Sequence, residues 1–122
     1  MQKILLVEDD PFLIDIYSQK LKKSGFDVVV EAVGSKVLEA VNNENPALLV
    51  LDIVLPEMDG WEVLQALSKD KKFSKLKIMI FSNLGQRSEV EKGIKLGAVK
   101  YLIKAEYTPS EVIEEIKKLL KP

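Results

Sequence analysis

Chemically useful side chains directly follow four of the most apolar runs in this 122-residue sequence. They are Glu8, Asp9 and Asp10 after residues 3–7, Asp52 after residues 47–51, Ser82 and Asn83 after residues 76–81, and Lys104 after residues 101–103. Each one alone has an ordinary structural explanation, because turn residues and helix caps normally follow strands. Together they supply carboxylates, a hydroxyl and an amine, a set that can act on a charged substrate.

The carboxylates in this set predict a cation site. Glu8, Asp9 and Asp52 would repel one another if they met in one crevice, and Lys104 is the only cation that these strand ends offer. The sequence has no histidine and no cysteine, so the ligands would be oxygen atoms, which favour a hard ion. A shallow cluster with room for water suits Mg²⁺ better than a Ca²⁺ cage. We therefore expect Mg²⁺ as the cofactor.

Asp52 is the candidate for the reacting group. An ionised carboxylate can attack phosphorus without a general base, which is consistent with the absence of histidine. Mg²⁺ and Lys104 would neutralise charge on the equatorial phosphoryl oxygens, and Ser82 would donate a hydrogen bond to one of them. The expected product is an acyl phosphate on Asp52.

Hydrophobic patterning predicts the elements that position these residues. Apolar runs rich in Val, Ile and Leu occur at residues 3–7, 27–33, 47–51, 76–81 and 101–103. Most are apolar on both faces, as buried parallel strands are, and the stretches between them have helical spacing. This (βα)5 alternation predicts an α/β fold, a doubly wound parallel five-stranded sheet with helices on both faces. Its ligand crevice would lie at the carboxyl ends of the strands.

Local signals mark several helix ends. Asp10 followed by Pro11 is typical of a cap and a first turn, and Gly25 is typical of a helix end. Residues 108–111 form a capping box, and residues 88–91 form a weaker one. Gly93 lies inside a predicted helix and suggests a loosely held segment that shifts on activation.

Composition limits the class of protein. With 18 basic and 19 acidic residues the formal net charge is -1, so no global field attracts nucleic acid or an anionic membrane. The absence of cysteine excludes a disulfide framework, and no apolar run approaches membrane-spanning length. We expect one domain over residues 1–122, in a soluble cytoplasmic protein without direct nucleic-acid or membrane partners.

The motifs resemble the receiver domain of two-component response regulators, such as the chemotaxis receivers. The acidic pair Glu8 and Asp9, the stretch "DIVLPEMDG" at residues 52–60, Ser82, Tyr101 and Lys104 each match a motif of that family. The resemblance implies a flavodoxin-like receiver fold with strand order 2-1-3-4-5, two helices on one face of the sheet and three on the other. It also implies metal ligation by Asp9, Asp52 and the backbone carbonyl of Val54, with Glu8 acting through water.

The function that the resemblance implies is a signalling switch and not an enzyme with a separate substrate. A sensor histidine kinase or a histidine phosphotransfer protein would donate the phosphoryl group to Asp52, and self-hydrolysis would remove it. Ser82 and Tyr101 would move inward and remodel one surface for an unknown downstream protein. That surface would include Gln86, Arg87, Glu91, Lys95, Tyr101 and Glu106.

Three features depart from the family pattern. Ala105 follows Lys104 where the family usually has proline, commonly with a cis bond, so either a trans bond or local strain is open here. Val54 and Leu84 are apolar where side chains flank the attacking water, which predicts slow self-dephosphorylation. The sequence stops at residue 122, directly after the last predicted helix, so it is either a stand-alone receiver or a fragment of a longer regulator. We expect a stand-alone receiver, and the last helix favours a monomer.

Two alternatives come from other classes of protein. One is a pseudo-receiver, an interaction module that keeps the fold without being phosphorylated. The other is a Mg²⁺-dependent phosphohydrolase that resembles the haloacid dehalogenase group, but those enzymes carry the nucleophile after the first strand and add a cap domain. Here the candidate nucleophile follows the third apolar run.

Overall fold

Five parallel strands form a central sheet between two layers of helices in the computed structural model, which describes residues 1–121. The elements are β1 (Lys3–Val7), α1 (Pro11–Lys23), β2 (Asp27–Glu31), α2 (Val37–Glu44), β3 (Leu48–Leu51), α3 (Gly60–Lys69), β4 (Lys77–Ser82), α4 (Arg87–Lys95), β5 (Lys100–Ile103) and α5 (Pro109–Leu119). Short 3-10 turns occupy Gly34–Lys36, Lys71–Phe73 and Lys104–Glu106. The strand order is β2-β1-β3-β4-β5, which confirms the predicted α/β fold.

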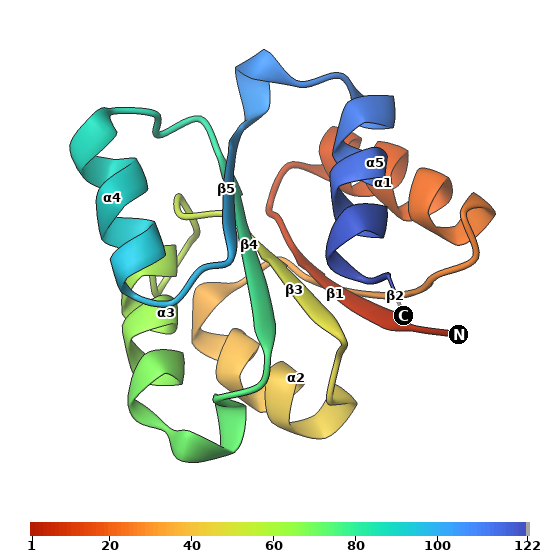
Figure 1. The fold of residues 1–122 in the computed structure, drawn as a ribbon. Coiled ribbons are helices and arrows are strands. Elements are labelled where there is room, and N and C mark those ends of the chain that lie inside the picture. Colours follow the sequence, from red (N-terminus) through yellow and green to blue (C-terminus); the bar gives the residue numbers. More distant parts are fainter. Residues whose placement is uncertain (122) are drawn as a thin grey trace.

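The helices divide unequally between the two faces of the sheet. Figure 1 shows α1 and α5 together on one face, and α2, α3 and α4 on the other. This division into two and three helices was predicted. Because strand side chains alternate between faces, each strand contributes to both cores: Ile4 and Leu6 of β1 pack with the α1 and α5 cluster, while Leu5 and Val7 pack on the opposite side.

The predicted helix caps are correct at two helices and wrong at one. Oδ1 of Asp10 accepts from the backbone N–H of Phe12, and Thr108 caps α5. The predicted box at residues 88–91 is wrong, because α4 already begins at Arg87 and Glu89 accepts from the backbone N–H of Gln86. Residues 88–91 therefore lie inside the helix, and the capping box is formed by Gln86 and Glu89.

The predicted strand 27–33 is too long at its carboxyl end. β2 ends at Glu31, and the carboxylate of this residue accepts from the backbone N–H groups of Ala32 and Val33. Those two donors are therefore satisfied by a side chain and do not take part in the hydrogen bonding of the sheet.

Along residues 1–121, no helix has both the length and the apolar character needed to cross a membrane.

Candidate functional site

A hollow lies at the carboxyl edge of the sheet. Its volume is about 260 Å³, and it is lined by Glu8, Asp9, Asp10, Leu13, Asp52, Val54, Ser82, Asn83 and Lys104. The structure thus brings together all the predicted site residues except Tyr101. Tyr101 belongs to β5 and does not line the hollow. This convergence follows from topology, because β1, β3 and β4 are adjacent and end at the same edge.

Lys104 bridges two buried carboxylates in this hollow. Its Nζ lies 2.8 Å from Oδ2 of Asp52 and 2.6 Å from Oε1 of Glu8. Burial lowers the pKa of the Lys104 ammonium, but the hydrogen bonds to Asp52 and Glu8 outweigh it and the pKa is raised. The lysine is therefore held in its charged form.

Glu8 is the most deeply buried carboxylate of the site, with 2% of its surface exposed. Burial raises its pKa, and the hydrogen bond from Lys104 only partly offsets this effect. Both partners of one ion pair thus have raised pKa values. The causes differ, because burial disfavours the charged form of Glu8, whereas the hydrogen bonds to Asp52 and Glu8 stabilise the charged form of Lys104. One lysine also faces the carboxylates of both Glu8 and Asp52. The site has an excess of negative charge.

The donor set of the site fits a hard divalent cation. One carboxylate oxygen from each of Glu8, Asp9 and Asp52 lies within 4.8 Å of the others. Asp9 is exposed, whereas Asp52 is only 5% exposed, so one side of the cluster opens to water. Oxygen ligands and an open side suit Mg²⁺, which keeps part of its hydration shell.

The loop from Asp52 to Gly60 is built to support the carboxylate. A Cβ atom on Gly60 would lie 2.5 Å from the carbonyl oxygen of Asp52 and 2.6 Å from Cα of Ile53, so only glycine fits there. Asp59 caps α3 by accepting from the backbone N–H of Glu62. Within the loop, the backbone N–H of Val54 donates to Oδ1 of Asp52. The Asp-Gly pair therefore fixes the loop behind Asp52.

Ser82 and Tyr101 both contact the backbone of Leu84. Ser82 is fully buried, and its Oγ accepts from the N–H of Leu84 at 3.3 Å. The hydroxyl of Tyr101 donates to the Leu84 carbonyl, and burial raises the pKa of Tyr101 to about 12. The loop after β4 is thus tied to both predicted switch residues at one position.

Gly93 serves close packing in this region. A Cβ atom there would lie 2.6 Å from Cδ1 of Ile80 and 2.9 Å from Cδ2 of Tyr101. The missing side chain lets α4 approach the sheet and the tyrosine ring directly. Gly93 therefore has a packing role against Tyr101, and a shift of α4 on activation stays a prediction.

Sequence reasoning gave no role to a contact between Asn83 and Ala105. The Lys104–Ala105 peptide bond is trans, and the N–H of Ala105 donates to Oδ1 of Asn83 at 3.1 Å. A proline at this position has no N–H and could not form this bond. Two features of the sequence could have predicted this contact. Ala105 stands where the family usually has proline and so keeps a backbone N–H, and Asn83 supplies a side-chain amide oxygen that can accept from it.

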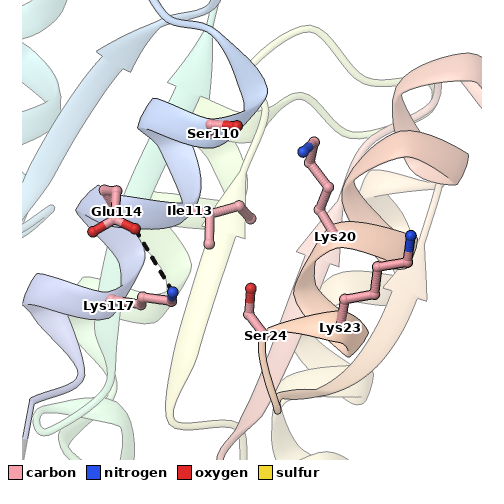
Figure 2. A pocket seen from close by; sticks show the side chains of 7 residues that line it. All are labelled: Lys20, Lys23, Ser24, Ser110, Ile113, Glu114 and Lys117. Carbon is pink, nitrogen blue, oxygen red and sulfur yellow. Dashed lines mark ion pairs between the residues drawn. The ribbon is translucent and has the colours of Figure 1, made fainter.

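A second hollow lies on the α1 and α5 face (Figure 2) and has a volume of about 230 Å³. It is lined by Lys20, Lys23, Ser24, Ser110, Ile113, Glu114 and Lys117. None of the predicted site residues belongs to it, and its Glu114 and Lys117 pair with each other at 3.6 Å. Because lysines near helix carboxyl ends complement the helix dipole, these cations have a structural explanation.

Comparison with known proteins agrees with this geometry. Residues 4–117 match the family described as "Response regulator receiver domain". The chain is 34% identical over 122 residues to the alkaline phosphatase synthesis transcriptional regulatory protein PhoP of Bacillus subtilis (strain 168), covering 98% of this chain and 49% of PhoP. It is 31% identical over 121 residues to the DNA-binding dual master transcriptional regulator RpaA of Synechocystis, covering 99% of this chain and 50% of RpaA.

A solved structure shows the same fold. The BeF3-activated N-terminal receiver domain of Klebsiella pneumoniae RstA matches with a TM-score of 0.88 and 29% identity, covering 98% of this chain and 99% of that one. The chain spans about half the length of the curated relatives it matches. On the family match and the relatives above, this chain belongs to the receiver domains of two-component response regulators.

Proposed function

We propose that residues 1–122 form one receiver domain that acts as a phosphoacceptor switch in a two-component phosphorelay, with Asp52 as the phosphoacceptor. The observation that carries this proposal is the environment of Asp52. Its carboxylate is almost fully buried, lies 2.8 Å from Nζ of Lys104, and shares an acidic cluster with Glu8 and Asp9. A carboxylate between a fixed cation and a cation site is suited to accept a phosphoryl group.

The donor in this proposal is a phosphohistidine of a sensor histidine kinase or of a histidine phosphotransfer protein. An oxygen of Asp52 attacks phosphorus, and the bond from phosphorus to the imidazole nitrogen breaks with its electron pair left on that nitrogen. Lys104 neutralises charge on the transferred oxygens, and the Ser82 hydroxyl donates a hydrogen bond to one of them. Water later hydrolyses the aspartyl phosphate and restores Asp52. The chain therefore switches its own state and turns over no separate substrate.

Asp9, Asp52 and the backbone carbonyl of Val54 would hold Mg²⁺, and Glu8 would act through a bound water. When bound, the ion neutralises the charge that develops on the phosphoryl oxygens. The geometry supports this assignment, because one carboxylate oxygen from each of Glu8, Asp9 and Asp52 lies within 4.8 Å of the others and Asp9 leaves one side of the cluster open to water.

The surface around α4, β5 and α5 is the proposed output surface, read by a downstream protein in the cytoplasm. Tyr101 couples this surface to the site through the backbone of Leu84. The Tyr101 hydroxyl donates to the Leu84 carbonyl, and the Leu84 N–H donates to Oγ of Ser82. An inward movement of Ser82 toward a phosphoryl group would therefore act on Tyr101 and α4. Residues on this surface are Gln86, Arg87, Glu91, Lys95, Tyr101 and Glu106.

We also propose slow self-dephosphorylation. Val54 lines the hollow with an exposed apolar side chain, at 61% exposure, and Leu84 is also apolar. Neither side chain can orient an attacking water by hydrogen bonding. A phosphoryl lifetime of only seconds would contradict this part of the proposal.

Intact mass spectrometry tests the function. The protein is incubated with Mg²⁺ and acetyl phosphate, in parallel with Asp52→Asn. A single added phosphoryl group that is absent from the variant supports the switch. Continuous release of phosphate from phosphoesters would instead indicate a phosphohydrolase, and absence of modification would indicate a pseudo-receiver.

A further inference from the structure

We propose that Asn83 is a positioning residue for Lys104, acting through the backbone N–H of Ala105. This inference rests on the proposed function of the site and adds a residue to its machinery. Its structural basis is the 3.1 Å hydrogen bond from the N–H of Ala105 to Oδ1 of Asn83.

The bond lies where the sheet ladder stops. The last paired residues of β4 and β5 are Ser82 and Ile103. Asn83 directly follows the first of these residues, and Ala105 lies two positions beyond the second. The side chain of Asn83 therefore links the two chain segments just past the point where backbone pairing ends.

Lys104 lies between these two restraints. On one side its backbone continues from Ile103, which is paired in the sheet, and on the other side it continues into Ala105, which is held by Asn83. From this position its side chain, only 12% exposed, reaches both Asp52 and Glu8. Its direction therefore depends on backbone that is fixed before and after it.

Without Asn83 the carboxyl-terminal side of Lys104 is held weakly. The turn over Lys104–Glu106 supplies a bond from the N–H of Tyr107 to the Lys104 carbonyl, but its length is 3.4 Å, near the limit for a useful hydrogen bond. Rotation of this peptide would let the ammonium favour Glu8 over Asp52, since both lie within reach. Even a small displacement of the ammonium away from Asp52 should slow phosphoryl transfer strongly.

Asn83 is itself exposed, so the loss of its hydrogen bond has little effect on folding. The expected effect is on the site. Asn83→Ala should slow the phosphorylation of Asp52 by acetyl phosphate at saturating Mg²⁺ by about tenfold. Asn42→Ala, at an exposed position of α2 away from the hollow, is the matched control and should leave the rate unchanged.

A double-mutant cycle tests the route through Ala105. Ala105→Pro removes the donor, so Asn83→Ala should have no further effect on the rate in the Ala105→Pro background. An equal loss of rate in both backgrounds would overturn the inference, because Asn83 would then act by another route. An unchanged rate in Asn83→Ala alone would overturn it as well.

Two NMR measurements on the unphosphorylated protein separate this inference from the proposed function. In Asn83→Ala the amide of Ala105 should lose its protection from hydrogen exchange, and the ¹⁵N resonance of the Lys104 ammonium should shift. Unchanged exchange and an unchanged resonance would show that Asn83 positions nothing. If the wild-type chain accepts no phosphoryl group, the proposed function fails, while these two spectra still decide whether Asn83 holds Lys104.

Discussion

The ammonium nitrogen of Lys104 lies 2.8 Å from the carboxylate of Asp52, although 52 positions separate the two residues in the sequence. The contact joins the ends of β3 and β5, which are not neighbours in the sheet. Lys104 therefore crosses the end of β4 to reach its partner, and the same nitrogen also pairs with Glu8 after β1. One side chain thus neutralises charge from two separate strand ends.

Removal of this cation should lower stability. Lys104→Met leaves two buried carboxylates without a partner, and we expect the free energy of unfolding near neutral pH to fall by about 2 kcal/mol, less than for a fully buried pair because the hollow admits water. Urea denaturation measures the loss. Lys95→Met, at an exposed position of α4, is the control and should change stability by less than about 0.5 kcal/mol. Equal values for the two variants would contradict the assigned role of Lys104.

Glu115 of α5 should make stability depend on pH. Hydrogen bonds from Lys100 and then Lys118 lower its pKa from the ordinary value of 4.5, so the folded state favours the carboxylate. Its contribution is therefore present above about pH 4.5 and is lost as the pH falls through the lower folded-state pKa. Glu115→Gln should cost about 0.5 kcal/mol near neutral pH, since Lys100 is 41% exposed in its side chain.

The pH comparison for Glu115 uses urea denaturation at about pH 7 and about pH 3. The difference between wild type and Glu115→Gln should shrink at the lower pH, because the wild-type carboxylate is then increasingly protonated. A difference of the same size at both pH values would show that packing, and not charge, accounts for the effect. Glu114→Gln is the control, because Glu114 is 66% exposed in its side chain and lies 3.6 Å from Lys117.

Gly93→Ala should destabilise the protein even though alanine favours helices. The added Cβ would meet Ile80 and Tyr101 at distances no ordinary contact tolerates, and such overpacking costs about 1–3 kcal/mol. Ser88→Ala, at an exposed position in the same helix, should be neutral or slightly stabilising. Thermal denaturation compares the two variants, and a Gly93→Ala variant as stable as Ser88→Ala would refute the packing role.

Trp61 should report movement of α4. The Nζ of Lys92 lies 4.4 Å from the centre of the Trp61 ring, so a residue of α4 contacts the start of α3. If phosphorylation shifts α4, this cation-π contact changes and with it the environment of the indole. We expect the fluorescence of wild-type protein to change on phosphorylation and that of Lys92→Met to change much less. An equal response in both proteins would show that Trp61 senses something other than Lys92.

The sequence predicted the fold because its signals are local and repeated. Each strand is an apolar run, and parallel strands joined by helices leave little choice of topology. Glu8, Asp9, Asp52, Ser82 and Lys104 could be assigned to one edge for the same reason, and the structure brings them into one hollow. The end of β2 was predicted two residues too late. The apolar pattern continues through Ala32 and Val33, but their backbone N–H groups donate to the carboxylate of Glu31.

Contacts between distant side chains could not be predicted from the pattern. Glu57 adopts a left-handed conformation with φ of 68° and accepts a hydrogen bond from Ser35, a residue 22 positions away. The packing of Gly93 on Tyr101 and the bond from Ala105 to Asn83 likewise depend on how loops meet in space. The apolar periodicity determines where the site lies and says nothing about these contacts.

The most direct test of the central claim is chemical identification of the residue that carries the phosphoryl group. Protein treated with acetyl phosphate and Mg²⁺ is reduced with borohydride, which converts an aspartyl phosphate to homoserine, and its peptides are sequenced by mass spectrometry. The proposed function predicts homoserine at position 52 and unmodified Asp9 and Asp59. Reduction at another carboxylate, or none at position 52 in protein shown to be phosphorylated, would contradict it.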